Sequence, residues 1–356
     1  MEILDILREA VEARASDILL SAGAPVTFHI QGRLETFRSS EVLDGDRSRK
    51  LVYEFLTMEQ RKFFEMERDL DVGYHVPDLA RFRVSVFQQR GTVAAVLRIV
   101  PFEIPHYRDI GLSDRTLMEM VNTPSGLILI TGPTGAGKST TIASYIEYLN
   151  AEHGVPKHII TLEDPIEYMF QNKSCLIDQR ELGMDTKGYV RGLKAALRQM
   201  PHVIFVGEMR DRETIETALT AAETGNIVIS TLSTQSAGKT VNRIIDVFPL
   251  EHQAEIRTRL SLTLRAVVSQ VLLRRADADA RICAREIMFV NNPISNLIRE
   301  GKVHQLNNAI STHARDGMNL MDDSLIGLCN QGLIGYVDVM ARLADPEKAR
   351  ALKRRA

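Results

Sequence analysis

The stretch "GLILITGPTGAGKSTT", residues 126–141, decides the fold of this chain. Gly132, Gly137, Lys138 and Ser139 fill the spacing G-x-x-x-x-G-K-[ST], which is typical of a phosphate-binding loop, the P-loop. The apolar run before the loop predicts a buried strand, and the segment "STTIASYIEYLN" after it predicts a helix. The stretch therefore predicts an α/β fold in which a strand, the loop and a helix follow one another.

Each part of the loop has a physical role in holding a triphosphate. The glycines let the backbone turn so that successive N–H groups face the phosphate oxygens, and the next helix presents its positive N-terminal end to the same anion. We expect Lys138 to reach the β- and γ-phosphates of ATP and Ser139 to ligate Mg²⁺. The expected nucleotide-binding residues are Gly132, Pro133, Thr134, Gly135, Ala136, Gly137, Lys138, Ser139 and Thr140.

A second segment, "SAGKT" at 236–240, resembles the end of another P-loop. Its first glycine would fall at Ser233, so the backbone turn that the loop needs is missing. We expect this segment to begin a helix after a strand.

Three more short runs, apolar on both faces and rich in β-branched residues, follow the P-loop. They are "HIITLED" (158–164), "VIFVGE" (203–208) and "IVISTL" (227–232). Segments such as "RETIETALTAAE" (212–223) read as helices between them. This alternation predicts a buried, parallel sheet in an α/β core.

Acidic residues stand at the ends of two of these runs, Glu163 with Asp164 and then Glu208. In open α/β sheets, ligands bind beyond the C-terminal ends of the strands, where both sites lie. We expect Glu163 to polarise the attacking water and Glu208, in the Walker B position, to join the Mg²⁺ shell through water; the two roles could be exchanged. Gly207 stands where many P-loop proteins carry aspartate. The alternative is that these acids only cap helices.

The pattern changes along the chain in a way that predicts two domains. Up to residue 100, short alternating segments follow an opening helix and predict a small α+β module with antiparallel strands. Residues 101–114 contain two prolines and no periodicity, as in a stiff linker. Residues 115–356 form the predicted ATPase domain, and we expect the region beyond residue 250 to be mostly helical, as in "AEIRTRLSLTLRAVVSQVLL".

The composition excludes several classes of protein. A net charge of −2, from 44 basic and 46 acidic residues, does not indicate a nucleic-acid partner. The three cysteines are widely spaced and form no CxxC pair, so they indicate neither a disulfide framework nor a zinc site and fit a reducing cytosol. No stretch approaches the roughly 18 apolar residues of a membrane-spanning helix.

Blocks along nearly the whole chain resemble one family, the PilT-type ATPases that retract type IV pili, within the larger secretion-ATPase superfamily. The order and the spacing of these blocks also resemble the family. The blocks are "ASDILLSAG" (15–23), "ARFRVSVFQQRG" (80–91), "GPTGAGKSTT" (132–141), "TLEDPIEY" (161–168), "VGEMRDRETIETALTAAETG" (206–225) and "RIIDVFP" (243–249).

The resemblance implies a RecA-like P-loop NTPase domain preceded by a smaller PAS-like α+β domain, in a hexameric ring with nucleotide at the subunit interfaces. It implies that arginines of the small domain reach the ATP of the neighbouring subunit. Arg81 and Arg83 are favoured among four candidates because they lie at i and i+2, on one face of a strand; the other two are Arg90 and Arg98. Arg243 matches a family position near the nucleotide.

The function that the resemblance implies is Mg²⁺-dependent ATP hydrolysis that powers pilus retraction and twitching motility. The implied partners are further copies of the chain in a homo-hexamer, an inner-membrane pilus platform protein and a paralogous retraction ATPase, and the implied location is the cytoplasm, peripheral to the inner membrane. Two alternatives stay open. One is an accessory ring subunit with weak hydrolysis that modulates a retraction motor, and the other is an assembly or secretion ATPase of the same superfamily.

Several positions depart from the family pattern. Asn226 and Ser233 stand where the family has histidines, and neither side chain takes up a proton near neutral pH as histidine does. The family motif "AIRNLI" is Pro293-Ile294-Ser295-Asn296-Leu297-Ile298, so a proline has entered and the arginine is absent. The lead into the Walker B strand is "RQMPH" (198–202), and Leu19 replaces another family histidine. We expect nucleotide binding and hydrolysis to persist with altered coupling or speed.

Overall fold

The structure, a computed structural model, describes residues 2–30, 33–37, 41–77, 79–100 and 103–352. The chain divides into two compact units. The first comprises Met1–Glu103 with Pro165–Met169, and the second comprises Ile104–Asp164 with Phe170–Ala356. Of the expected linker, residues 101 and 102 lie outside the described residues.

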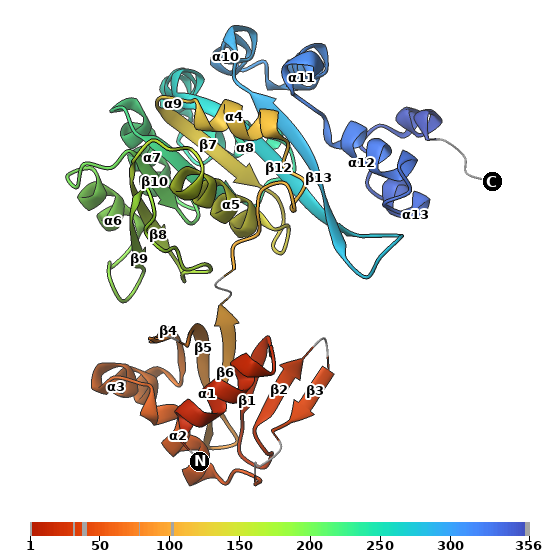
Figure 1. Cartoon of the computed structure of the whole chain (residues 1–356). Coiled ribbons are helices and arrows are strands. Elements are labelled where there is room, and N and C mark those ends of the chain that lie inside the picture. The colour runs from red at the N-terminus through yellow and green to blue at the C-terminus, as the bar shows by residue number, and fades with distance from the viewer. Residues whose placement is uncertain (1, 31–32, 38–40, 78, 101–102, 353–356) are drawn as a thin grey trace. The chain divides into compact units, whose positions relative to one another are not determined.

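The first unit is an antiparallel sheet of six strands in the order β3-β2-β1-β6-β5-β4, with helices packed on it (Figure 1). The strands are β1 (Asp17–Leu20), β2 (Thr27–Ile30), β3 (Arg33–Thr36), β4 (Asp69–Val76), β5 (Ala80–Gln89) and β6 (Thr92–Val100). The helices are α1 (Ile3–Glu12), α2 (Gly45–Glu54) and α3 (Met58–Glu67).

Alternation in the sequence predicts the strand β5 of this sheet correctly. In β5, Phe82, Val84 and Val86 are buried while the residues between them face outward. The apolar spacing over 47–66 predicts one helix, but the structure has two, because Thr57 begins a new helix with a capping box to Gln60. The alternating segment at residues 26–35 predicts one strand, but the structure has two, β2 and β3.

The second unit is a seven-stranded sheet in the order β13-β12-β7-β11-β10-β8-β9. All neighbours are parallel except β12 and β13, which pair antiparallel. The strands are β7 (Gly126–Thr131), β8 (His158–Glu163), β9 (Leu176–Glu181), β10 (Val203–Val206), β11 (Ile227–Leu232), β12 (Leu264–Arg274) and β13 (Arg281–Phe289). The expected buried runs are therefore confirmed as parallel strands.

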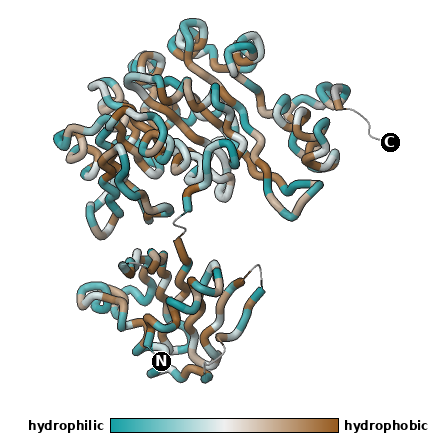
Figure 2. Tube along the Cα trace, in the orientation of Figure 1, coloured by the Kyte–Doolittle hydropathy of each residue, from teal (hydrophilic) through white to brown (hydrophobic). Residues whose placement is uncertain are grey.

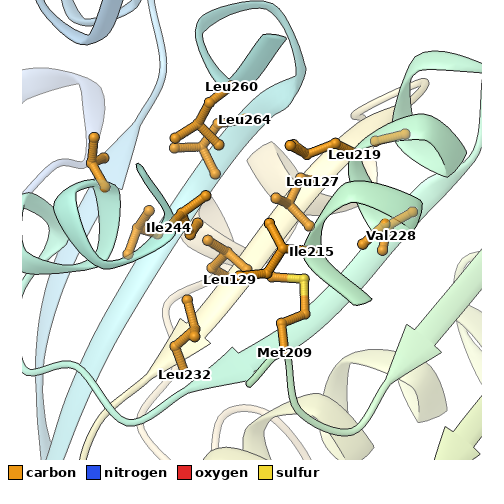
Figure 3. Packing of buried hydrophobic residues seen from close by; sticks show 14 of the residues in the cluster. Leu127, Leu129, Met209, Ile215, Leu219, Val228, Leu232, Ile244, Leu260 and Leu264 are labelled. Atoms are coloured by element: carbon orange, nitrogen blue, oxygen red, sulfur yellow. The ribbon is translucent and has the colours of Figure 1, made fainter. Parts of the chain in front are cut away.

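Both faces of this sheet are covered, which explains why its strands are apolar throughout. Leu127 and Leu129 of β7 pack into a cluster with residues of α7, α8 and α9 (Figure 3). Ile128 and Ile130 face the opposite way, into a cluster with α4 and α5. In Figure 2 the hydrophobic colour accordingly concentrates on the strands at the centre of the sheet.

The helices of the second unit lie between and beyond these strands. They are α4 (Asp114–Val121), α5 (Lys138–Ala151), α6 (Tyr189–Ala196), α7 (Arg212–Glu223), α8 (Ala237–Asp246), α9 (Leu250–Thr263), α10 (Asn292–Arg299), η1 (Val303–Gln305), α11 (Leu306–Thr312), η2 (Ala314–Asp316), α12 (Met321–Asn330), α13 (Tyr336–Met340) and η3 (Pro346–Ala351). The segment "SAGKT" is confirmed as a helix start, because Ser236 caps α8. No helix in the described part of the chain is long and apolar enough to cross a membrane.

The expectation of a mostly helical region beyond residue 250 is wrong for residues 264–289. The helix α9 ends at Thr263, and the chain continues directly into β12, which pairs with β7, and then into β13. The run "LRAVVSQVLLR" contains three valines, and a short apolar run does not by itself distinguish a buried helix from a buried strand. The free hydrogen-bonding edge of β7 favours the strand.

Residues 105–112 are anchored on the second unit. The Ser144 hydroxyl of α5 donates to the carbonyl of Pro105 at 2.7 Å. The Tyr107 ring is buried and packs edge-on against Tyr148 of α5. The Arg285 guanidinium, buried on β13, donates to the carbonyls of Ile110 and Gly111. This part of the expected linker is therefore fixed to the helix that follows the P-loop.

Candidate nucleotide-binding and active site

The P-loop is held in a conformation that only glycine adopts easily. Gly132, Gly135 and Gly137 have φ angles of 144°, 78° and 84°. A Cβ atom on Gly132 would lie 2.3 Å from the backbone oxygen of Gln270. The first glycine of the motif therefore allows the loop to pass directly against β12.

Gln270 is a residue of this site that the sequence analysis missed. Its side chain is 2% exposed, its Nε2 donates to the carbonyl of Ala136 at 2.8 Å, and its Oε1 accepts from the Thr141 hydroxyl at 3.0 Å. It thus ties the P-loop to the first turns of α5. A lone amide in the apolar run 264–273 was the available signal, but it points to the loop only once that run is known to be a strand beside β7.

Lys138 begins α5 and lies over the loop. Its ammonium donates to the carbonyls of Gly132 at 2.8 Å and Pro133 at 3.0 Å. Gly137 caps the helix without a side-chain hydrogen bond, so the first N–H groups of α5 are available to an anion. Ser139 and Thr140 lie in that first turn, where a hydroxyl can meet a metal ion bound to the phosphates.

Glu163 ends β8 and is a buried carboxylate, 6% exposed. One of its oxygens accepts hydrogen bonds from the Thr161 hydroxyl at 2.6 Å and from the Gln179 amide at 3.2 Å. These contacts fix the carboxylate at the carboxyl edge of the sheet, on the strand next to β10. A fixed, desolvated carboxylate is suited to orient and polarise a water molecule.

Glu208 follows β10 at the same edge of the sheet. Its side chain is 27% exposed and pairs with the exposed Arg210 at 2.7 Å. This carboxylate is therefore the more accessible of the two acids, as an outer ligand of a hydrated metal ion has to be.

Tyr189, the first residue of α6, explains the glycine that precedes Glu208. A Cβ on Gly207 would lie 2.8 Å from the Tyr189 hydroxyl and 3.3 Å from the carbonyl of Leu162. Burial raises the pKa of the Tyr189 hydroxyl well above its usual range, and the negative charges of Asp164, Glu208 and Glu163 raise it further. The neutral phenol of Tyr189 thus lies beside the end of β10, in the place that an aspartate side chain at position 207 would fill.

The family of the chain follows from comparison with known proteins. Residues 2–322 match the family described as type II/IV secretion system protein. The chain belongs to this family. Within it, the chain is 42% identical to the type IV pilus retraction ATPase PilT of Pseudomonas aeruginosa, over 98% of this chain and 99% of that protein. A twitching motility protein of Neisseria gonorrhoeae is 40% identical, over 97% of this chain and 91% of that protein.

A solved structure gives the same assignment. A crystal structure of the pilus retraction motor PilT with bound ADP superimposes with a TM-score of 0.90 at 44% identity, covering 98% of each chain. The chain is therefore a PilT-type ATPase of the type II/IV secretion family, with a nucleotide-binding α/β domain and a smaller N-terminal domain.

The four candidate arginines of the first unit differ in their surroundings. Arg81 and Arg83 share the outward face of β5. Arg98, directly opposite Arg83 on β6, donates to Asp17 at 2.8 Å, and Arg90 lies in the β5–β6 turn with a φ of 47°. Arg83 is exposed and has no hydrogen bond or ion pair with any described residue.

Arg243 lies on the exposed side of the last turn of α8 and, within the described residues, makes no hydrogen bond or ion pair. The structure therefore does not bring it into contact with the P-loop of its own chain. Its placement near a nucleotide stays a prediction.

The departures from the family pattern have local structural roles. The Asn226 amide donates to the carbonyl of Ala221 at 3.0 Å, at the end of α7 and the start of β11. Pro293 fits the first turn of α10, where no intrahelical N–H is needed. The Ser295 hydroxyl donates to the carbonyl of Ser261 at 2.7 Å and joins α10 to α9. Proline therefore leaves the helix of the altered motif intact.

The donor set suits Mg²⁺ held mainly by nucleotide and water. Among the described residues, no group of three or more histidine, cysteine, aspartate or glutamate side chains could hold a metal ion. Ser139 and Glu208 offer one hydroxyl and one accessible carboxylate. Mg²⁺ commonly takes one or two protein ligands of this kind and completes its shell with phosphate and water oxygens.

Proposed function

We propose that the chain is an ATP-hydrolysing motor that works as a homo-hexamer and powers type IV pilus retraction, and with it twitching motility. One observation carries this proposal. The P-loop and two glutamates, one buried and one accessible, lie at the carboxyl ends of strands of one sheet, in a chain similar over its whole length to a retraction ATPase.

The P-loop holds the triphosphate. Its backbone N–H groups and the N-terminal end of α5 bind the phosphates, and Lys138 leaves the carbonyls of Gly132 and Pro133 for the β- and γ-phosphate oxygens. Ser139 and, through water, Glu208 would hold Mg²⁺. When bound, the ion neutralises charge on the phosphates. The similarity of the chain to the PilT motor that was crystallised with bound ADP supports this placement of nucleotide.

Glu163 orients the attacking water. The Thr161 hydroxyl and the Gln179 amide fix one carboxylate oxygen, and burial keeps bulk water from competing for it. Hydrolysis of a phosphoryl group depends mainly on such positioning and on charge stabilisation. Gln270 keeps the loop and the first turns of α5 in register during the reaction.

Arginines of a neighbouring subunit complete the site. Arg81 and Arg83 lie on the outward face of their sheet, so in a ring they can be offered to the nucleotide of the next copy. An arginine supplied in this way stabilises charge in the transition state and makes hydrolysis depend on the arrangement of two subunits. That dependence is how hydrolysis can move one domain against another. The motor would act from the cytoplasm on an inner-membrane pilus platform protein, and a paralogous retraction ATPase is a further partner.

An accessory ring subunit with weak hydrolysis is the second candidate function. Asn226 and Ser233 favour it, because neither can take up a proton where the family pattern has a histidine. An assembly or secretion ATPase is the third, and no contact among the described residues favours it.

Steady-state hydrolysis of ATP by the purified chain tests the proposal. We expect Mg²⁺-dependent turnover that falls at least ~100-fold in Glu208→Gln, the size of effect that removal of a preorganised electrostatic group produces. Glu213→Gln is the matched control, because Glu213 is exposed and pairs with Lys194 at the surface. Equal and negligible rates in the wild type and Glu208→Gln would favour the accessory function. In cells, deletion is expected to leave excess unretracted pili, whereas loss of all pili would indicate an assembly motor.

A further inference from the structure

A large cavity lies beside the catalytic edge of the sheet, between the end of β9, the loop 182–188, α6 and the start of α7. Its volume is about 1250 Å³, larger than most small-molecule pockets. None of the P-loop residues lines it. Asp164 and Tyr189 lie on its boundary with the catalytic acids, so the cavity and the active site are neighbours but separate.

Arg180, which lines the cavity, carries a buried hydrogen-bond donor without an acceptor among the described residues. This residue of β9 donates through Nη2 to the carbonyl of Asp185 at 3.1 Å. Its Nη1 is buried and has no partner in the described part of the chain. A buried donor without an acceptor destabilises the folded state, and a charged donor does so more strongly, so such an atom indicates a missing acceptor.

Further cations line the same wall. Arg191, Lys194 and Arg198 follow at spacings of three and four residues, which places them along one face of α6 and its C-terminal flank. Lys187 lines the cavity from the loop just before α6. Lys194 pairs with Glu213, and Arg198 donates to the Lys194 carbonyl. Lys187 and Arg191 have no hydrogen bond or ion pair among the residues that the structure describes.

The acids that line the cavity are largely committed elsewhere. Asp185 accepts from the backbone N–H of Glu181 at 2.8 Å, and Asp211 accepts from the backbone and hydroxyl of Thr214 to cap α7. Glu213 pairs with Lys194. Asp164 alone faces the cavity without a described partner, on the wall of β8 rather than on that of α6. Positive charge therefore collects on the wall of β9 and α6.

We propose that this wall is a second anion site, in which Arg180, Lys187 and Arg191 bind the phosphate group of a small phosphorylated molecule. The planar guanidinium of Arg180 suits a phosphate, and α6 begins at Gly188 without a side-chain cap, which leaves its first N–H groups available to the same anion. The phosphate can be the free product of hydrolysis or part of a larger ligand such as a nucleoside monophosphate, for which the cavity has room.

Equilibrium dialysis with labelled inorganic phosphate and, separately, labelled AMP tests this site. The measurements use the full chain carrying Lys138→Ala, which weakens binding at the P-loop. Any binding that the P-loop backbone retains is not expected to change with Arg180→Gln. We expect saturable binding that Arg180→Gln weakens at least ~10-fold, as loss of a charge-assisted hydrogen bond predicts. Tighter binding of AMP than of phosphate identifies a phosphorylated ligand, and equal affinities identify the hydrolysis product.

Arg274→Gln is the matched control, because it makes the same change of charge on the exposed β12–β13 hairpin and is expected to change the affinity less than ~2-fold. If Arg180→Gln does not fold, as judged by circular dichroism, the double variant Lys187→Gln/Arg191→Gln replaces it with the same expectation.

Three outcomes overturn the proposal. The first is that neither probe binds saturably, which includes the case in which the wall binds an acidic protein segment instead. The second is an affinity that Arg180→Gln does not diminish. The third is a loss of affinity in Arg274→Gln equal to that in Arg180→Gln. The readout is binding and not turnover, so its failure is distinguishable from failure of the motor function.

Discussion

The two sheets of the molecule place their functional groups in opposite ways. In the seven-stranded parallel sheet, helices cover both faces and the reactive groups gather at one edge, each fixed by a buried neighbour: Glu163 by Thr161 and Gln179, the P-loop by Gln270. In the six-stranded antiparallel sheet, the outward face of β5 carries Arg81 and Arg83 on a regular strand. Arg83 has no described partner.

This difference separates a site that one chain forms by itself from a group that needs a second chain. The parallel sheet prepares a site within one chain, because its strand ends converge. The antiparallel sheet leaves a positive group exposed, and two arginines directly opposite each other, Arg83 and Arg98, destabilise a strand pair unless something compensates. Asp17 compensates at Arg98 only. We infer that Arg83 acts when a second copy supplies the anion.

The largest effect is expected at the buried acid of the parallel sheet. Glu163→Gln keeps the shape and the hydrogen bonds of the side chain but removes the charge that polarises water. We expect kcat to fall ~10²–10³-fold with nucleotide affinity within ~3-fold of wild type, measured by steady-state hydrolysis and by binding of labelled ATP.

Glu181→Gln is the control for this variant, since Glu181 is equally buried on the neighbouring strand but lies outside the assigned catalytic roles. A wild-type rate for Glu163→Gln would transfer the role of polarising water to Glu208.

The next effect is expected on the antiparallel sheet. Arg83→Ala should lower kcat ~10²-fold, below the ~10³–10⁵-fold typical of a single transferred arginine, because Arg81 on the same face compensates in part. Affinity of an isolated subunit for nucleotide should not change. Mixing the variant with Glu163→Gln is expected to restore turnover, since each subunit type supplies what the other lacks. Absence of any rescue would argue against an arginine acting between copies.

A smaller effect is expected at the packing of Tyr189 on Gly207. Tyr189→Phe removes one hydroxyl and should lower kcat ~10-fold with KM little changed. Gly207→Ala places a methyl group 2.8 Å from that hydroxyl and should be more harmful in the wild type than in the Tyr189→Phe background. A double-mutant cycle on kcat measures this coupling, and additive effects would refute the contact as the reason for glycine at 207.

The parallel sheet was largely predictable from the sequence because its signals are local. The P-loop spacing and the apolar runs of β7, β8, β10 and β11 each fit within a few residues, and both acids stand directly at strand ends. The resemblance of whole blocks to a family supplied the domain order.

The contacts and the strand that could not be predicted from the sequence depend on residues far away along the chain. Gln270 contacts the P-loop across more than a hundred residues, and Tyr189 reaches Gly207, after β10, from the start of α6. The strand β12 was missed because its apolar run fits a helix equally well until β7 is known to have a free edge. The split of the helix over 47–66 at Thr57, by contrast, had a local signal in the capping box with Gln60.

The smallest effect is expected at Arg98, which lies directly opposite Arg83 and allows the two arginines to be compared. Arg98 is exposed and pairs with Asp17, so Arg98→Ala should lower the free energy of unfolding of the chain by less than ~1 kcal/mol and change kcat less than ~2-fold. Burial raises the pKa of Asp17, but hydrogen bonds from Arg98 and Ser16 together with the nearby positive charges outweigh burial and leave the pKa below the usual range of an aspartate.

A lowered folded pKa means that the Arg98–Asp17 pair contributes stability above the ordinary pKa of aspartate and loses it as the pH falls through the folded value. The difference between wild type and Arg98→Ala in urea unfolding should therefore be complete at neutral pH and vanish in acid. If Arg98→Ala instead lowered kcat as far as Arg83→Ala is expected to, pairing with Asp17 would not distinguish a structural arginine from one that acts on a neighbouring subunit. The whole outward face of β5 and β6 would then belong to the active site.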